Sequence, residues 1–165
     1  MKKIILFIDA CSKAGGYVSG LFMLLIVALI TLEICARTLF NTSTLIGDEY
    51  CAYFFVVVVM MGLSFSMKEG THIRISLLRS KLPEPVLRVL DLLVLAGAIA
   101  LAGFAFYHAV LMTYDVWDLG MTADSISETP LYIPQLVIPV GLLLLILQLI
   151  GDFLRRLLSF QIRSF

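Results

Sequence analysis

The sequence lacks the residue patterns from which most enzyme and metal sites are built. Its three cysteines form no CxxC pair, so neither a disulfide framework nor a zinc site is expected. It contains no GxGxxG motif, P-loop or GxSxG element, and no nucleophile–base arrangement. Basic and acidic residues number 12 each, and the absence of net charge argues against nucleic acid as a partner. We therefore expect a protein that is not an enzyme and holds no cofactor.

Apolar residues, by contrast, make up 61% of the 165 residues, more than a soluble domain of this size could hide from water. Uncharged runs occur four times, over 14–32, 50–67, 92–114 and 129–151. A transmembrane helix needs ~20 such residues. The sequence therefore predicts one all-α membrane domain over 1–165, with four tilted transmembrane helices at 16–39, 48–68, 86–116 and 132–155.

The basic residues predict the orientation of these helices. Of the 12, only Arg37 falls near a segment expected outside; the others precede the first helix, separate the second from the third, or follow the fourth. These eleven are Lys2, Lys3, Lys13, Lys68, Arg74, Arg79, Lys81, Arg88, Arg155, Arg156 and Arg163. In segment 117–131 every charged residue is acidic. By the positive-inside rule both termini are cytoplasmic, and 40–47 and 117–131 face outward.

Two further segments are amphipathic. Residues 1–14 carry apolar positions at helical spacing, which predicts a short interfacial helix that ends at a turn formed by Gly15 and Gly16. Between the second and third helices, four aliphatic residues alternate with three basic ones: Ile73, Ile75, Leu78 and Leu82 with Arg74, Arg79 and Lys81. We expect this cytoplasmic segment to contact lipid phosphates or a partner, with His72 as a turn residue beside it.

Three charged residues lie in or beside the apolar runs. Glu33 and Arg37 are four residues apart and so share a helix face. Glu49 begins the second helix at a similar depth. Because an isolated charge in lipid is costly, we predict that Arg37 is shared by Glu33 and Glu49, which ties the first helix to the second. The alternative is that Glu33 carries a transported proton, but an arginine one turn away would hold it ionised.

The two histidines raise the question of haem. His72 is expected beyond the cytoplasmic end of the second helix, and His108 in the outer half of the third. Their depths differ by roughly 20 Å on helical rise, so they cannot share one iron. We expect His108 to be an interior hydrogen-bonding group.

Small residues and one proline are the remaining candidates for structural roles. Gly62, Gly97 and Gly103 allow close helix packing, either inside the chain or against another membrane protein. Pro139 lies well inside the fourth helix and is expected to kink it.

One stretch of the chain resembles a known family. It begins with an arginine that ends the first helix (Arg37) and a glutamate that opens the second (Glu49). A mid-helix glycine (Gly62), the run EGTHI at 69–73, and Leu82–Pro83 before the third helix follow in order. This pattern over 37–83 resembles the small, DctQ-like membrane subunit of tripartite ATP-independent periplasmic (TRAP) transporters.

The resemblance implies a role in the inner membrane of a bacterial cell. Such transporters take up organic acids, commonly carboxylates and sugar acids, by using a sodium gradient. A periplasmic binding protein delivers the substrate, and a large membrane subunit contains the substrate and sodium sites. The small subunit binds the large one and extends its scaffold. Two alternatives remain open: a small homodimeric exporter that uses Glu33, and an accessory subunit of another membrane complex.

Overall fold

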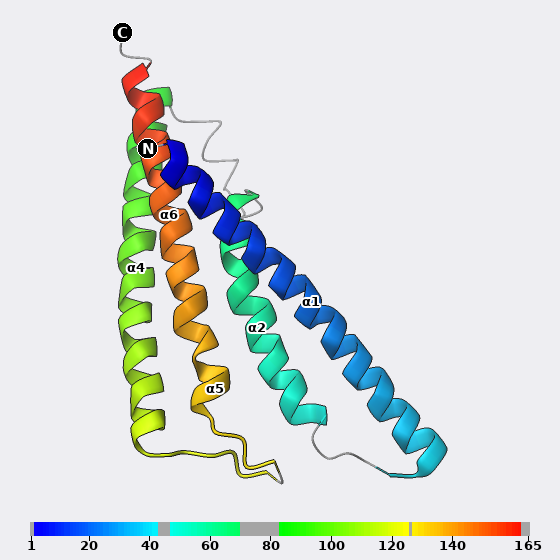
Figure 1. Ribbon diagram of the computed structural model, residues 1–165. Helices are drawn as coiled ribbons and strands as arrows, with labels where there is room; N and C mark the ends of the chain where they lie inside the picture. The colour runs from blue at the N-terminus through cyan, green and yellow to red at the C-terminus, as the bar shows by residue number, and fades with distance from the viewer. Residues whose placement is uncertain (1, 43–46, 70–82, 126, 163–165) are drawn as a thin grey trace.

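The computed structural model describes residues 2–42, 47–69, 83–125 and 127–162, and it confirms an all-helical chain (Figure 1). Apart from one isolated bridge between Thr122 and Pro130, the described residues form no strand. The helices are α1 (Lys2–Phe40), α2 (Gly47–Lys68), α4 (Glu84–Asp118), α5 (Tyr132–Gln135) and α6 (Val137–Ile162). By length and composition, α1, α2, α4 and the α5–α6 segment can each cross a membrane, which confirms the four expected spans.

The helices stand in a row rather than in a closed bundle. α2 packs between α1 and α6, and α6 packs between α2 and α4. Toward its N-terminus α1 also contacts α6 directly. Figure 1 shows both chain termini at one end of the row, which we call the termini end. The opposite end, where α1 finishes, α2 begins and residues 119–131 lie, is called the loop end. At the loop end α1 diverges from the other helices, so that α1 and α4 form the two edges.

The predicted turn at Gly15 and Gly16 is wrong, because α1 runs without interruption from Lys2 to Phe40. The two glycines serve close packing instead. A Cβ atom at Gly15 would lie 2.8 Å from the carbonyl oxygen of Met61, and one at Gly16 would lie 2.6 Å from the ring of Phe65. Both positions therefore let α2 approach the α1 backbone. The interfacial placement of residues 1–14 stays a prediction.

The fourth span has a discontinuity near its start. α5 ends at Gln135, the chain turns at Leu136, and α6 begins at Val137. Pro139 is buried in the first turn of α6. It has no N–H group to donate to the carbonyl of Gln135, four residues earlier, so the helical bonding is interrupted at this point. The break falls three residues before the proline rather than at it.

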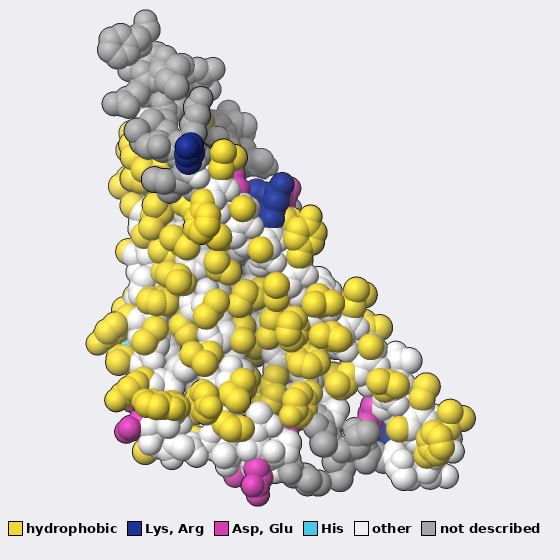
Figure 2. All heavy atoms as spheres, in the orientation of Figure 1, with side chains coloured by type: hydrophobic (Ala, Val, Ile, Leu, Met, Phe, Trp, Pro, Cys, Tyr) yellow, Lys and Arg dark blue, Asp and Glu magenta, His cyan; other side chains and the backbone are white. Residues whose placement is uncertain are grey.

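Very little of the apolar surface is covered by the chain itself. In the described part, six hydrophobic residues are buried: Ile8, Leu95, Ala102, Ala109, Val116 and Leu149. None of the most apolar 18-residue stretch of α1 is buried. Figure 2 shows apolar side chains along the length of the helices, with acidic side chains at the loop end and others beside the basic side chains toward the termini end. Such a surface is compatible with lipid or with another apolar chain, but not with water.

Candidate functional site

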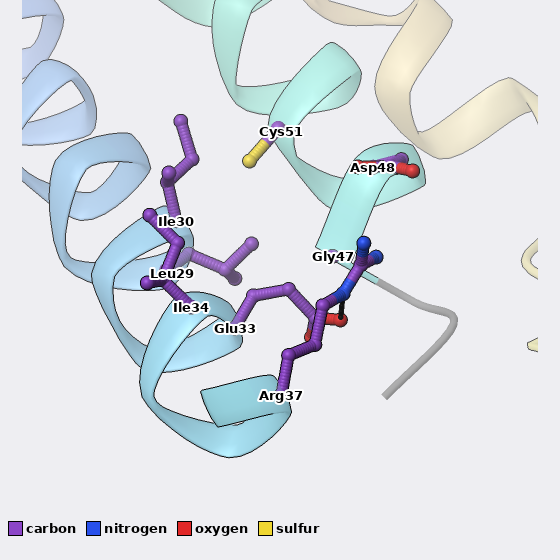
Figure 3. Close-up of a pocket in the computed structure, with 8 residues that line it drawn as sticks. All are labelled: Leu29, Ile30, Glu33, Ile34, Arg37, Gly47, Asp48 and Cys51. Carbon is purple, nitrogen blue, oxygen red and sulfur yellow. Dashed lines mark hydrogen bonds and ion pairs between the residues drawn. The ribbon is translucent and has the colours of Figure 1, made fainter. Parts of the chain in front are cut away.

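A groove of about 200 Å³ lies between α1 and α2 at the loop end (Figure 3). Its lining residues are Leu29, Ile30, Glu33, Ile34, Arg37, Gly47, Asp48 and Cys51. Glu33 and Arg37 both extend from α1 toward the first turn of α2. The Arg37 Nε donates to the Glu33 Oε1 at 2.8 Å. The Arg37 side chain is 57% exposed and that of Glu33 only 12%. The carboxylate is therefore the inner member of this pair, and the guanidinium closes the groove from outside.

We predicted that Arg37 pairs with both Glu33 and Glu49. The pair with Glu33 is present, but Glu49 does not reach Arg37, so that part of the prediction is wrong. The reason is the rotation of α2 about its axis. Gly47 is the residue that faces α1, since a Cβ there would lie 3.6 Å from Glu33 Oε2. Glu49 follows two residues later, about 200° around the helix, and so points away from α1. Similar depth was a necessary condition for the pair but not a sufficient one.

Glu49 instead lies against a group of hydroxyls from the 119–131 segment. The Tyr53 hydroxyl donates to Glu49 Oε1 at 2.6 Å, and the Ser127 hydroxyl lies 3.0 and 2.9 Å from the two carboxylate oxygens. Ser125 and Thr129 contact the Ser127 oxygen at 2.9 and 2.8 Å. We call these four hydroxyl residues and Glu49 the hydroxyl cradle. It fastens the 119–131 segment to α2 and uses the acceptor capacity of the carboxylate.

The sequence reasoning missed the hydroxyl cradle. The available signal was the presence of three hydroxyl residues, Ser125, Ser127 and Thr129, within five positions of a segment expected to face outward. A carboxylate at the outer end of a neighbouring helix is a natural acceptor for them.

A second set of polar contacts, also missed, joins three helices at the termini end. Arg155 of α6 pairs with Asp9 of α1, and it lies 3.6 Å from Asp152 one turn earlier. Arg156, the next residue, pairs with Asp91 of α4. These contacts hold the first turns of α1 against α6. Near lipid, charges that are paired in this way avoid much of the cost of burial.

Next to these ion pairs, toward the middle of α1 and α6, two neutral side chains form a fully buried hydrogen bond. The Ser12 hydroxyl donates to Gln148 Oε1 at 2.7 Å, and both residues are at most 1% exposed. Gln148 Nε2 donates toward Asp152 Oδ1 at 3.4 Å. Gln148 is the one polar residue in the apolar run 142–150, which was the signal for an interhelical contact.

The three glycines singled out from the sequence divide into two groups. A Cβ at Gly62 would lie 3.0 Å from Ser19 Oγ, so Gly62 packs against α1. At Gly97 and Gly103, on α4, nothing lies within 4 Å of such an atom. These two glycines are not used by packing among the described residues.

His108 is not an interior group, and that expectation is wrong. It lies exposed on α4, on the side away from α6. Its ring stands edge-on to the rings of Phe104 and Tyr107, with centroid distances of 4.3 and 5.4 Å. A single histidine in an apolar helix could not be assigned a side from the sequence, because apolar residues surround it in every direction.

Four predicted residues, His72, Arg74, Arg79 and Lys81, lie outside the described residues. Within the described ranges no group of three or more His, Cys, Asp and Glu side chains could hold a metal ion. Many of the described polar residues form contacts between helices or within one helix, and the groove between α1 and α2 is the described pocket that charged side chains line.

Known proteins resemble this chain over most of its length. The family model for "Tripartite ATP-independent periplasmic transporters, DctQ component" matches residues 26–159. The chain is 22% identical to the ectoine TRAP transporter small permease protein TeaB of Halomonas elongata over 148 residues, which cover 90% of this chain and 76% of that protein. It is 23% identical to a TRAP transporter small permease protein of Haemophilus influenzae over 154 residues, with 92% and 90% coverage.

The family match covers far more than the 37–83 segment that first suggested it: it begins within the first candidate span and extends across the other three. Members of this family are transporter subunits and not enzymes. The chain belongs to the DctQ family, the small multi-pass membrane permease subunits of TRAP transporters.

Proposed function

We propose that this chain is the non-catalytic small subunit of a sodium-driven TRAP transporter in a bacterial inner membrane. In this role it binds a large membrane subunit, which holds the substrate and sodium sites, and extends the static scaffold around it. A periplasmic binding protein delivers the substrate. The substrate class is organic acids, such as carboxylates or sugar acids.

The arrangement of the helices in a row supports a scaffold role. A transport pathway within one chain needs helices that surround a polar space at the middle of the membrane. Here the principal packing pairs follow one another, and the edge helices α1 and α4 have long uncovered apolar faces. Such a row can lie against a larger protein on one side and against lipid on the other.

The positions of the polar groups support the same assignment. The hydroxyl cradle and the Glu33–Arg37 pair lie at the loop end, and the Asp9–Arg155 contacts lie at the termini end. Glu33, the candidate proton site of the exporter alternative, has its carboxylate bound to Arg37. A carboxylate that carries a coupling ion must exchange partners freely, which an arginine one turn away opposes.

The proposed orientation has both termini in the cytoplasm. It follows from the basic residues, eleven of which belong to the termini end or to the segments joined to it. The loop end, with the 119–131 segment and its acidic residues, then faces the periplasm, where a binding protein would arrive.

The substrate would be selected by the other two components. The Halomonas elongata relative is described as part of an ectoine transporter, but at 22% identity this carries no assignment to the present chain. Ectoine therefore joins carboxylates and sugar acids in the panel of compounds to be tried.

Purification from native cells in a mild detergent tests the proposal. A large multi-spanning membrane subunit should remain bound to this chain at a fixed ratio. Recovery of the chain alone as a homodimer would favour the exporter alternative. Recovery with a respiratory or other complex would favour the accessory-subunit alternative.

A further inference from the structure

The face of α4 that points away from α6 carries a polar side chain that the chain itself does not explain. Six residues spaced three or four apart follow this face: Leu93, Gly97, Leu101, Phe104, His108 and Leu111. At 100° per residue they fall within a sector of about 80°. All six are exposed, and we call them the outward row. The opposite side, with Leu95 and Ala102, packs into the core against Leu149 of α6.

His108 lies at membrane depth. The uncharged stretch of α4 runs over 92–114, and His108 is five residues from its middle, or ~7–8 Å along the helix axis. The hydrocarbon core extends ~15 Å to either side of the bilayer midplane. The imidazole therefore falls inside the hydrocarbon, and its side chain is too short to reach the headgroups.

The described part of the chain offers the ring nitrogens of His108 no hydrogen bond. Its described contacts are the edge-on rings of Phe104 and Tyr107. Lipid tails can neither donate nor accept a hydrogen bond. Ionisable residues inside a membrane normally face protein or a water-filled cavity. An outward-facing histidine at this depth indicates that protein covers the outward row in the assembled complex.

Gly97, the second residue of the outward row, gives a second indication. Glycine inside a helix is less favourable than alanine by about 1 kcal/mol, so its presence calls for a compensating contact. Gly62 has one within the chain, because Ser19 lies against it. Gly97 has none in the described part of the chain, where no atom lies within 4 Å of the position of its Cβ. A neighbouring helix could approach the α4 backbone closely there.

We propose that the outward row of α4 is the surface on which a transmembrane helix of the large transport subunit packs, with a hydrogen-bonding group of that helix opposite His108. This inference rests on the proposed function, which supplies the partner. A second copy of this chain is the competing occupant, and it is one outcome of the test below.

The exposed face of α1, the helix at the opposite edge of the protein, is the surface to which we compare the outward row of α4. It too is apolar and contains an open glycine, Gly20. Its mid-span residues 20–30, however, include no polar side chain, and Thr31, which follows them, satisfies its hydroxyl within the helix by donating to the carbonyl of Val27 at 2.7 Å. The exposed middle of α1 can therefore face lipid without an unsatisfied polar group.

Site-specific photo-crosslinking in native membranes can distinguish the two edges. Leu101 in the outward row is 70% exposed and Leu24 on α1 is 69% exposed, and both lie near mid-span. Each is replaced separately by p-benzoylphenylalanine, and the complex is irradiated and then purified. We expect a covalent adduct with the large subunit from position 101 and no such adduct from position 24.

The outcomes separate the inference from the proposed function. If the large subunit co-purifies but crosslinks from position 24 and not from 101, the inference is wrong while the proposed function stands. An adduct between two copies of this chain at position 101 also overturns it. If no large subunit co-purifies with the unaltered chain, both are overturned.

A second measurement tests the histidine directly. His108→Leu removes the hydrogen bond, and His108→Gln retains a donor and an acceptor. Interhelical hydrogen bonds in membranes correspond to about a threefold to twentyfold change in affinity. In a detergent titration we expect His108→Leu to lower the affinity for the large subunit by about threefold to twentyfold, and we expect His108→Gln to retain most of the original affinity. Unchanged retention by His108→Leu would contradict the proposal.

Discussion

Replacement of Gly141 by alanine should loosen the contact between α6 and α2. Gly141 is buried, and an added Cβ would lie 2.6 Å from Met60 Cβ and 2.7 Å from the Met60 carbonyl oxygen. Ordinary van der Waals contact begins near 3.4 Å, and part of the obstacle is backbone that cannot rotate aside. Overpacking of this kind costs about 1–3 kcal/mol, and alanine regains up to about 1 kcal/mol through helix propensity. We expect a net loss of about 1–2 kcal/mol, or a five- to thirtyfold smaller ratio of folded to unfolded protein.

Gly97→Ala is the matched control for this prediction. It makes the same chemical change in a membrane-spanning helix, but no atom of the described residues lies within 4 Å of the new methyl group. In the isolated chain it should leave the free energy of unfolding unchanged or raise it by up to about 1 kcal/mol. Both variants are unfolded reversibly by SDS in mixed micelles, followed by the fluorescence of the single tryptophan, Trp117. Equal stability of the two variants would refute the packing that the structure places at Gly141.

Two further predictions concern the polar contacts between helices. In double-mutant cycles, Glu49→Ala and Ser127→Ala should be coupled by at least about 0.5 kcal/mol, whereas Glu49→Ala and Arg37→Ala should add. Coupling of Glu49 to Arg37 instead would restore the ion pair that the structure contradicts. Gln148→Leu should lower the free energy of unfolding by about 0.6–1.7 kcal/mol, and adding Ser12→Ala should cost little more because the partner is already lost. If the two losses simply add, the buried hydrogen bond is absent.

Much of the architecture could be predicted from the sequence because it depends on length and apolar content alone. Three of the four candidate spans fall close to the expected ranges: α2 begins and ends within one residue of its predicted bounds, α4 within two, and the fourth span also within two. The first span begins at Ile5 rather than at residue 16. Family membership followed from a few residues in order. These features do not require knowledge of how any helix is rotated about its axis.

The contacts between helices could not be predicted in the same way, because they depend on rotation. Glu49 and Arg37 lie at similar depth, yet Glu49 points to the opposite side of α2 and meets Ser127. His108 was expected inside and lies outside, since apolar residues on every side of α4 conceal which face is buried. Gly15 and Gly16 form a contact rather than a turn, and only the position of α2 decides between these uses of glycine.

Uptake by reconstituted proteoliposomes tests the central claim, that this chain supports transport without forming the transport path. The purified chain is placed in vesicles with an inward sodium gradient, alone or with the large subunit and the periplasmic binding protein. Labelled carboxylates, sugar acids and ectoine are offered outside. We predict accumulation by the three components together, none by this chain alone, and a large loss when only this chain is omitted. Accumulation by this chain alone, or full accumulation without it, would contradict the account.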